Sequence, residues 1–311
     1  MTRVHQPRSG TMQFWPRKRA KRIYPSVNFF SSNYNLQIPG FIGYKVGMVK
    51  VQYNDQDPNK KLKDSIVAPA TIIECPPLKP LNLRFYKKTI DGLKCLGELK
   101  SKNLDKELSR KIKISKKESV EKNFENFDEL RLIVYTQPKL TSLSKKKPEI
   151  LEIKLNCNLE EAKQLLEKKE ILLQDNFKEN MYIDIHAVTK GKGLQGSIKR
   201  FGISLKQKKS EKHKRAVGNL GAWTPKHVSH TVPQPGQMGF YTRTELNKII
   251  MKVDNSEEIN PKAGFKRYGV IKNQYIIVKG SIPGPTKRTI VLTPSIRKNN
   301  ETKLALKEVL K

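Results

Sequence analysis

The chain has 311 residues, and 62 Lys and Arg against 29 Asp and Glu give it a formal net charge of +33. Only 36 % of the residues are hydrophobic, which excludes a large apolar core along the whole chain. A protein of this charge repels itself and attracts polyanions, so the composition argues against an ordinary soluble enzyme and for an obligate nucleic-acid partner.

The cysteines and the apolar runs indicate the compartment. Cys75, Cys95 and Cys157 are odd in number, and their spacing fits neither a disulfide framework nor a metal-binding knuckle. No apolar run approaches the ~18 residues of a membrane span, and the basic N-terminus lacks the apolar core of a signal peptide. We expect a cytoplasmic protein with no membrane partner.

The charge is distributed unevenly along the chain. Residues 1–54 hold nine basic residues and no acid, residues 187–253 hold 14 basic residues and two acids, and residues 261–298 hold nine basic residues and no acid. Residues 91–180 differ, because 17 acids nearly offset 20 basic residues there. The distribution predicts basic segments that face phosphate around one charge-balanced insert that faces solvent.

Period-two alternation and β-branched residues predict six strands. In chain order these are Phe41–Val51, Val67–Cys75, Arg131–Thr136, Met181–Thr189, Gly269–Lys279 and Arg288–Thr293. Many short strands with scattered glycines favour a β-barrel. The predicted fold class is therefore mainly β with α insertions.

Helices are predicted at three places. Within the balanced insert they cover about 100–130 and 158–171, the second opening with Asn158 and Glu161 as a capping pair. A third begins at Thr242, because apolar residues follow at helical spacing up to Val253.

Residues 190–239 show neither the period-two alternation of a strand nor the spacing of a helix, and they contain eight glycines. A stretch this long without regular structure argues for an excursion that leaves the barrel and returns. At ~3.3 Å per residue, 40 residues folded back on themselves could reach ~60 Å. Such a segment would be ordered by the partner that it enters.

These patterns predict the following domain organisation. The chain divides into a basic N-terminal extension (1–40), a first barrel part (41–90), the charge-balanced α/β insert (91–180), a second barrel part (181–189 and 240–298), the basic glycine-rich loop (190–239) and a C-terminal tail (299–311).

Gly191, Gly193 and Gly196 form a G-x-G-x-x-G sequence, which formally matches a dinucleotide-binding fingerprint. An oxidoreductase would also need a helix after Gly196 and an acid ~20 residues further on. Lysines follow instead, and Glu211 is the only acid nearby. Glycines between lysines favour close approach of the backbone to phosphates, with no cofactor.

The histidines and nucleophiles give no sign of catalysis. His213, His227 and His230 lack cysteine or carboxylate partners, so hydrogen bonds to RNA or packing are favoured over zinc. No Ser or Cys lies in a nucleophile elbow, and no phosphate-binding P-loop sequence occurs. We expect no enzyme activity and no metal.

Trp223 lies between glycines and a proline, in a polar stretch with no apolar periodicity. It could anchor the barrel core, but stacking on bases or wedging into RNA fits this setting better. Trp15 is similarly placed, beside the basic run Arg17-Lys18-Arg19, for which a solvated tail is the alternative to phosphate contact.

Five blocks resemble the large-subunit ribosomal protein L3 family in its archaeal and eukaryotic form. They are Pro16–Ala20, Gly40–Met48, Val188–Gly193 through Lys199-Arg200, Gly221–Trp223 with Gly236–Phe240, and Lys279–Pro285. They occur in family order over nearly the whole chain. The match is lost in 91–180, and the C-terminal tail is shorter than in eukaryotic members.

The resemblance implies a translation-protein-type β-barrel, with a long loop and an N-terminal extension that penetrate large-subunit rRNA. It implies that Trp223 lies at the loop tip, close to the peptidyl transferase centre. It also implies a role early in subunit assembly and neighbours among the large-subunit proteins near the factor-binding side.

We therefore predict a structural constituent of the large ribosomal subunit that binds rRNA, acts without cofactors, forms no homo-oligomer and is not itself the peptidyl transferase. The alternative is a free nucleic-acid chaperone or compaction protein. The predicted RNA-binding residues are Arg17, Lys18, Arg19, Lys45, Lys190, Lys192, Lys199, Arg200, Lys212, His213, Lys214, Arg215, Trp223, Lys226, His227, Gln237, Arg243, Lys287 and Arg288.

Overall fold

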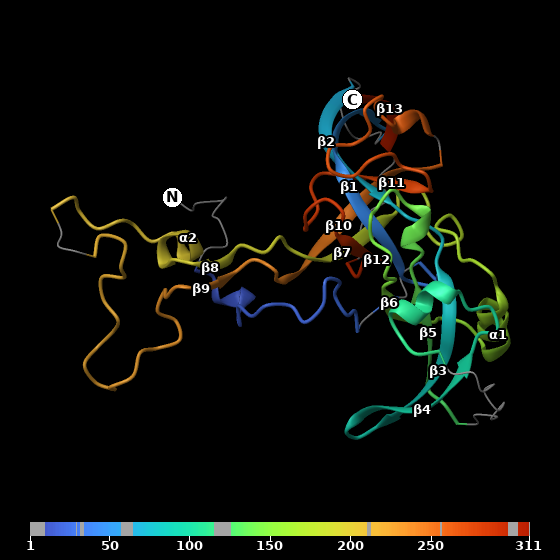
Figure 1. Ribbon diagram of the computed structural model, residues 1–311, viewed down its shortest axis with the longest axis horizontal. Helices are drawn as coiled ribbons and strands as arrows, with labels where there is room; N and C mark the ends of the chain where they lie inside the picture. Colours follow the sequence, from blue (N-terminus) through green and yellow to red (C-terminus); the bar gives the residue numbers. More distant parts are fainter. Residues whose placement is uncertain are drawn as a thin grey trace. The chain divides into compact units, whose positions relative to one another are not determined.

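The computed structural model describes residues 10–28, 30–31, 34–56, 65–114, 126–209, 213–255, 257–297 and 304–310. The chain divides into two compact units. We call Ile23–Ala187 with Arg243–Lys311 the body, and Met1–Arg22 with Val188–Thr242 the extension. Strands far outnumber helices in the described residues (Figure 1), which confirms the predicted mainly-β class.

Six strands pair in a closed ring, in the order β1–β12–β7–β10–β11–β2 and back to β1. Their bounds are β1 Phe41–Asp55, β2 Ile66–Glu74, β7 Tyr182–Val188, β10 Thr242–Asp254, β11 Tyr275–Lys279 and β12 Thr289–Pro294. A seventh strand, β13 (Leu304–Leu310), pairs with the later part of β1. That this ring is a barrel of the translation-protein type stays a prediction.

Strand β1 is long enough to have two successive partners along one edge. Its residues 41–44 pair with β12, and residues 50–55 pair with β13. At Gly43 a β-carbon would lie 2.5 Å from Ile73 Cγ2 and 2.8 Å from Cys75 Sγ, so no larger residue fits against β2. The glycine thus permits the close packing of β1 on its neighbour.

A second, four-stranded antiparallel sheet has the order β4–β3–β5–β6. Its bounds are β3 Lys79–Thr89, β4 Gly92–Lys100, β5 Glu129–Tyr135 and β6 Ile150–Lys154. Helix α1 (Leu159–Glu167) packs beside β3 and β5 and buries Ala162, Leu165 and Leu166. The predicted helix 158–171 is confirmed but ends at 167, and Asn158 makes no side-chain capping bond.

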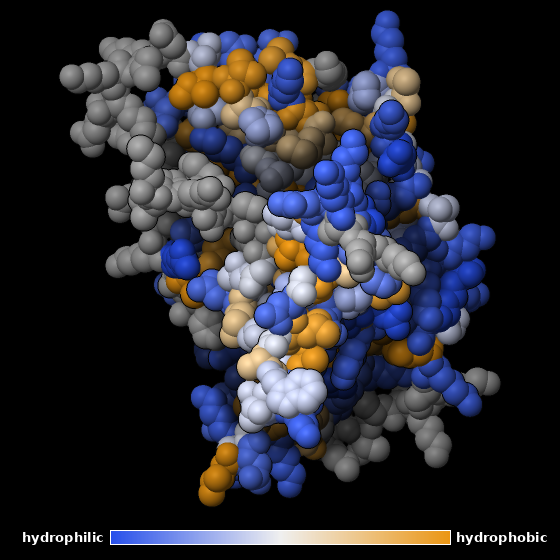
Figure 2. Space-filling view, turned by 90° about the vertical axis from the view of Figure 1, so that its left-hand side faces the viewer, coloured by the Kyte–Doolittle hydropathy of each residue, from blue (hydrophilic) through white to orange (hydrophobic). Residues whose placement is uncertain are grey.

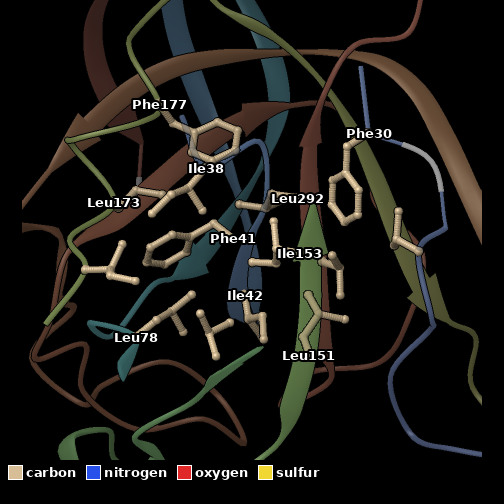
Figure 3. Close-up of a cluster of buried hydrophobic side chains, with 14 of the residues drawn as sticks. Phe30, Ile38, Phe41, Ile42, Leu78, Leu151, Ile153, Leu173, Phe177 and Leu292 are labelled. Atoms are coloured by element: carbon tan, nitrogen blue, oxygen red, sulfur yellow. The ribbon is translucent and has the colours of Figure 1, made fainter. Parts of the chain in front are cut away.

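One hydrophobic core joins the ring to the second sheet (Figure 3). Phe41, Ile42 and Leu292 of the ring pack with Leu151 and Ile153 of β6 in a single buried cluster. The charge-balanced stretch therefore shares its core with the ring, although its outer surface carries the balanced charge.

The predicted helix after Thr242 is wrong, because these residues form β10. Ile250 belongs to the core shared with the second sheet, whereas Ile249 and Met251 belong to a second cluster that includes Tyr44. A strand with a core on each face needs apolar residues in succession, and that pattern imitates helical spacing over a short window.

Two further predictions need correction. Between 100 and 130 the described residues form a short 3-10 helix, Lys106–Arg110, and the start of β5, while 115–125 lie outside the described residues. The predicted strand Gly269–Lys279 begins only at Tyr275, because the residues before it form a tight loop.

The extension contains little regular structure, as its glycine content predicted. A short ribbon pairs β8 (Gly193–Gln195) with β9 (Gly236–Met238), and α2 (Ser197–Phe201) follows β8. Its N-terminal part has one 3-10 turn, Met12–Phe14.

Candidate nucleic-acid interface

The extension is closed at its root by backbone hydrogen bonds. The Thr189 amide donates to the Tyr241 carbonyl at 2.9 Å, and the Lys192 amide donates to the Met238 carbonyl at 2.9 Å. Gly239 has φ +70°, and a β-carbon there would lie 2.1 Å from the Lys190 carbonyl oxygen. Only glycine permits the outgoing and returning segments of the chain to approach this closely.

Arg200 was predicted to contact phosphate, but its side chain is used inside the extension. Its guanidinium donates to the carbonyls of Gln237 at 3.0 Å and Gln234 at 2.9 Å. The Gln237 amide in turn donates to the carbonyl of Gly239 at 3.0 Å. These bonds fasten the returning segment to α2, and contact of either residue with RNA stays a prediction.

Arg17 and Trp15 form a small packed cluster with α2. The Arg17 guanidinium donates to the Arg200 carbonyl at 2.8 Å and lies 4.1 Å from the centre of the Phe201 ring. The Trp15 ring packs 6.1 Å from Phe201 and 5.6 Å from His230. Trp15 therefore joins parts of the extension, and the expectation that it resembles Trp223 is wrong.

A hollow of about 640 Å³ opens on the extension, between the N-terminal segment and the root. It is lined by Arg19, Ala20, Lys21, Gly191, Gly193, Gln237 and Phe240. The Ala20 amide donates to the Phe240 carbonyl at 2.8 Å, which holds the N-terminal segment beside the root. We call this the root hollow.

Cations are exposed in both stretches of chain that contribute residues to the root hollow. Lys18 and Arg19 are exposed in the N-terminal segment, and Lys190 and Lys192 are exposed at the root. Gly191 lies between these two lysines and Gly193 follows the second, so the backbone there carries no side chain at either position. The lining suits an anion with several negative oxygens, because it combines the cations Arg19 and Lys21 with the bare backbone of Gly191 and Gly193.

The G-x-G-x-x-G sequence does not form a dinucleotide site. A helix does follow Gly196, but α2 has only five residues and no acid in its first turn. Gly193 lies within β8 rather than in the turn between strand and helix. The glycines instead keep the root hollow open.

We call residues 196–235, between β8 and β9, the outer extension. It exposes most of its predicted RNA-binding residues. Lys199, His213, Lys214, Arg215, Lys226 and His227 are all exposed, whereas Lys212 lies outside the described residues. A second hollow of about 620 Å³ is lined by Leu205, His213, Lys214, Arg215 and Ala216. Figure 2 shows mainly hydrophilic side chains on the face that it presents.

Trp223 has an exposed fraction of 85 %. Gly221 before it has φ +122°, and the Gly221 amide donates to the Asn219 side-chain oxygen at 2.8 Å. This turn presents the indole outward, so the alternative of a barrel-core tryptophan is wrong.

Lys45 of the body was also predicted to bind RNA, and the structure corrects this. Its side chain is only 9 % exposed and donates to the carbonyls of Ile282 at 2.7 Å and Gly284 at 2.9 Å. Burial lowers the pKa of its ammonium group. Lys45 therefore fastens the loop before β12.

The remaining predicted residues of the body differ in exposure. Lys287 is exposed, whereas Arg243 and Arg288 are half-buried. Burial lowers the pKa of Arg288. All three belong to the body and not to the extension.

Sequence reasoning missed two sets of exposed cations. Lys21 lines the root hollow and Arg22 follows it. Lys262, Lys266 and Arg267 are exposed on a loop of the body. The acid-free composition of 1–54 and 261–298 was the signal that could have found them.

Charge separates the extension from the body. The extension carries 18 Lys and Arg with Glu211 as its one acid, and therefore +17 of the formal +33, within 77 of the 311 residues. In the described part of the chain, no three His, Cys, Asp or Glu residues gather as a metal site would require. No helix among these residues is long and apolar enough to cross a membrane.

A mainly-β body with a cationic extension of this kind defines a basic protein built to hold a polyanion. The comparison with protein families is more specific, because the model for "Ribosomal protein L3" matches residues 1–311. The chain belongs to the ribosomal protein L3 family.

Its archaeal relatives match over nearly their whole length. The chain is 45 % identical to "Large ribosomal subunit protein uL3" of Archaeoglobus fulgidus over 309 residues, which cover 95 % of this chain and 93 % of the relative. The protein of the same name from Methanosphaera stadtmanae is 44 % identical over 96 % of this chain and 94 % of the relative. That of Methanobrevibacter smithii is 41 % identical over 97 % and 95 %.

Proposed function

We propose that the extension is the principal rRNA-binding element of this chain, and that it organises RNA near the peptidyl transferase centre and aids early assembly of the large subunit. The chain itself, as a member of the L3 family, is a non-enzymatic structural constituent of the large ribosomal subunit, in association with its rRNA and proteins. The alternative of a free nucleic-acid chaperone is not supported.

The observation that carries the proposal is the charge of the extension. Eighteen basic residues against one acid would repel one another strongly in the absence of a polyanion. Phosphates that displace counterions from these side chains supply affinity without base specificity. Trp223 and the root hollow offer stacking and shape, which set position on folded RNA.

The proposal can be tested through the salt dependence of binding to a transcript of large-subunit rRNA. The triple variant Lys190→Ala, Lys192→Ala, Lys199→Ala should lower the slope of log K against log salt by roughly 0.7–0.9 per lost phosphate contact. The matched control Lys163→Ala, Lys168→Ala, Lys169→Ala removes three exposed cations of the charge-balanced stretch. An equal slope for both variants would contradict the proposal.

We propose further that the chain acts in the subunit as one copy, with neighbours among the large-subunit proteins near the factor-binding side. The resemblance of its five blocks to the family supports this part, and Trp223 is assigned to the loop tip on the same ground. Cross-linking of assembled subunits through single cysteines introduced in the outer extension would test it, since cross-links to proteins far from the factor-binding side would contradict it.

A further inference from the structure

A tight turn before β11 presents two cations on the body. The Phe265 amide donates to the Gly269 carbonyl at 2.8 Å, and the Gly269 amide donates back to the Phe265 carbonyl at 3.0 Å. Lys266 and Arg267 lie at the tip that these bonds close, and both are exposed. The tip therefore has a fixed backbone and two free cationic side chains.

The backbone of the turn is strained at a residue that is not glycine. Arg267 has φ +66°, in the left-handed region that side chains with a β-carbon rarely adopt. Such conformations persist only where the surroundings impose them, and they gather at ligand-binding sites. Gly264, with φ +70°, packs against Gly269 and completes the turn.

A buried carboxylate anchors the residues that follow Arg267 in the loop. Glu74, at the end of β2, is fully buried and accepts hydrogen bonds from the Tyr268 hydroxyl and from the backbone amides of Lys272 at 3.0 Å and Asn273 at 3.1 Å. The Asn273 side-chain amide adds a fourth bond at 2.8 Å. Four donors thus anchor the loop to the ring without using any of its cations.

The cations of the loop are left for an external partner. Lys262, Lys266 and Arg267 are exposed and form no ion pair within the described residues. No acid occurs between residues 261 and 298. A loop that is rigid, positively charged and acid-free is organised in advance for an anion, which lowers the entropy lost on binding.

We infer that the loop Pro261–Asn273 is a second, preorganised contact for rRNA phosphates, with Lys266 and Arg267 as the binding residues and Glu74 as a positioning residue. The inference rests on the proposed function in one respect, that the polyanion is rRNA. It concerns a different unit of the chain, since the loop belongs to the body and the root hollow to the extension.

The first test uses the full chain and a transcript of large-subunit rRNA. The double variant Lys266→Gln, Arg267→Gln should lower the salt slope of binding by about 1.4–1.8, as expected for two lost phosphate contacts. Lys168→Gln, Lys169→Gln is the matched control. An unchanged slope in the loop variant, beside a lowered slope for Lys190→Ala, Lys192→Ala, Lys199→Ala, would overturn this inference alone. Unchanged slopes in both would overturn the proposed function.

The second test locates the RNA. Ala263→Cys, in a background of Cys95→Ser and Cys157→Ser, allows an iron–EDTA group to be tethered beside the turn. Hydroxyl radicals should then cleave the bound transcript at a few discrete positions, and absence of cleavage would overturn the inference.

Glu74→Gln in this background should spread the cleavage over more positions. Cleavage as discrete as before, in a protein with an unchanged circular dichroism spectrum, would remove the positioning role.

Discussion

Burial separates the cations of this chain into two groups that the sequence does not distinguish. Lys45 and Arg200 donate to backbone carbonyls and hold loops in place. Lys18, Lys190 and Lys192 are exposed, each next to a residue that lines the root hollow. A lysine next to glycines looks the same in both groups, because the carbonyls that capture Lys45 lie more than 230 residues away along the chain.

Lys45→Met tests this division. The substitution leaves the Ile282 and Gly284 carbonyls without their donor, and each buried acceptor so orphaned costs about 1–3 kcal/mol. We expect chemical denaturation to show a lower free energy of unfolding, with an unchanged salt slope for rRNA binding. A lowered slope with unchanged stability would return Lys45 to the interface.

Trp223→Ala tests the exposed indole. An exposed side chain contributes little to folding, so the melting temperature of the isolated protein should hardly change, whereas truncation of a core tryptophan costs about 3–5 kcal/mol. Stacking on a base is worth about 1–3 kcal/mol, a small part of the total affinity. Subunits should therefore still assemble.

The consequence of Trp223→Ala should appear in function, as an altered peptidyl-transfer rate or altered sensitivity to drugs that bind the centre. Trp15→Ala is the contrasting variant, because Trp15 packs on Phe201 and should affect the extension itself. A wild-type transfer rate and drug response in Trp223→Ala subunits would contradict the assignment.

At the scale of elements, the root of the extension depends on one glycine. Gly239→Ala places a β-carbon 2.1 Å from the Lys190 carbonyl and forces alanine into the left-handed region, a conformation that costs about 1–2 kcal/mol. We expect faster proteolysis near β8 and β9. Gly196→Ala is the control, because nothing lies within 4 Å of its added carbon. Equal proteolysis of the two variants would show that the root tolerates the side chain.

Some strands could be predicted from the alternation of their residues, whereas elements whose conformation depends on tertiary contacts could not. The alternation of β1 and β7 follows directly from the sequence. β10 lies between two cores, so its consecutive apolar residues imitate a helix. Strands β3, β4, β6 and β13 were missed, although residues of β3 and β6 do alternate between buried and half-buried positions. Their pairing with neighbours decides their conformation.

For the whole molecule, charge composition indicates where exposed cations gather better than any single motif does. The acid-free segments 1–54 and 261–298 contain Arg19 and Lys21 of the root hollow and Lys266 and Arg267 of the body loop. Composition could not show which basic side chains form hydrogen bonds within the protein itself. Arg17 and Arg200, for example, donate hydrogen bonds to backbone carbonyls because the extension packs partly on itself.

The division of the chain into body and extension predicts how the protein responds to trypsin. The body buries two extended cores, whereas Phe201 and Gly239 are among the few buried residues of the extension. Its free energy of local opening should therefore be small in the absence of a partner.

Limited trypsin digestion with and without a large-subunit rRNA transcript tests this account most directly. Without RNA, the first cuts should fall in 10–22 and 190–239 while 41–90 stays intact. With RNA, the cuts in the extension should disappear. Digestion of 41–90 before the extension, or an extension cut equally fast in both conditions, would contradict the claim that the extension is the rRNA-binding element of an independently stable body.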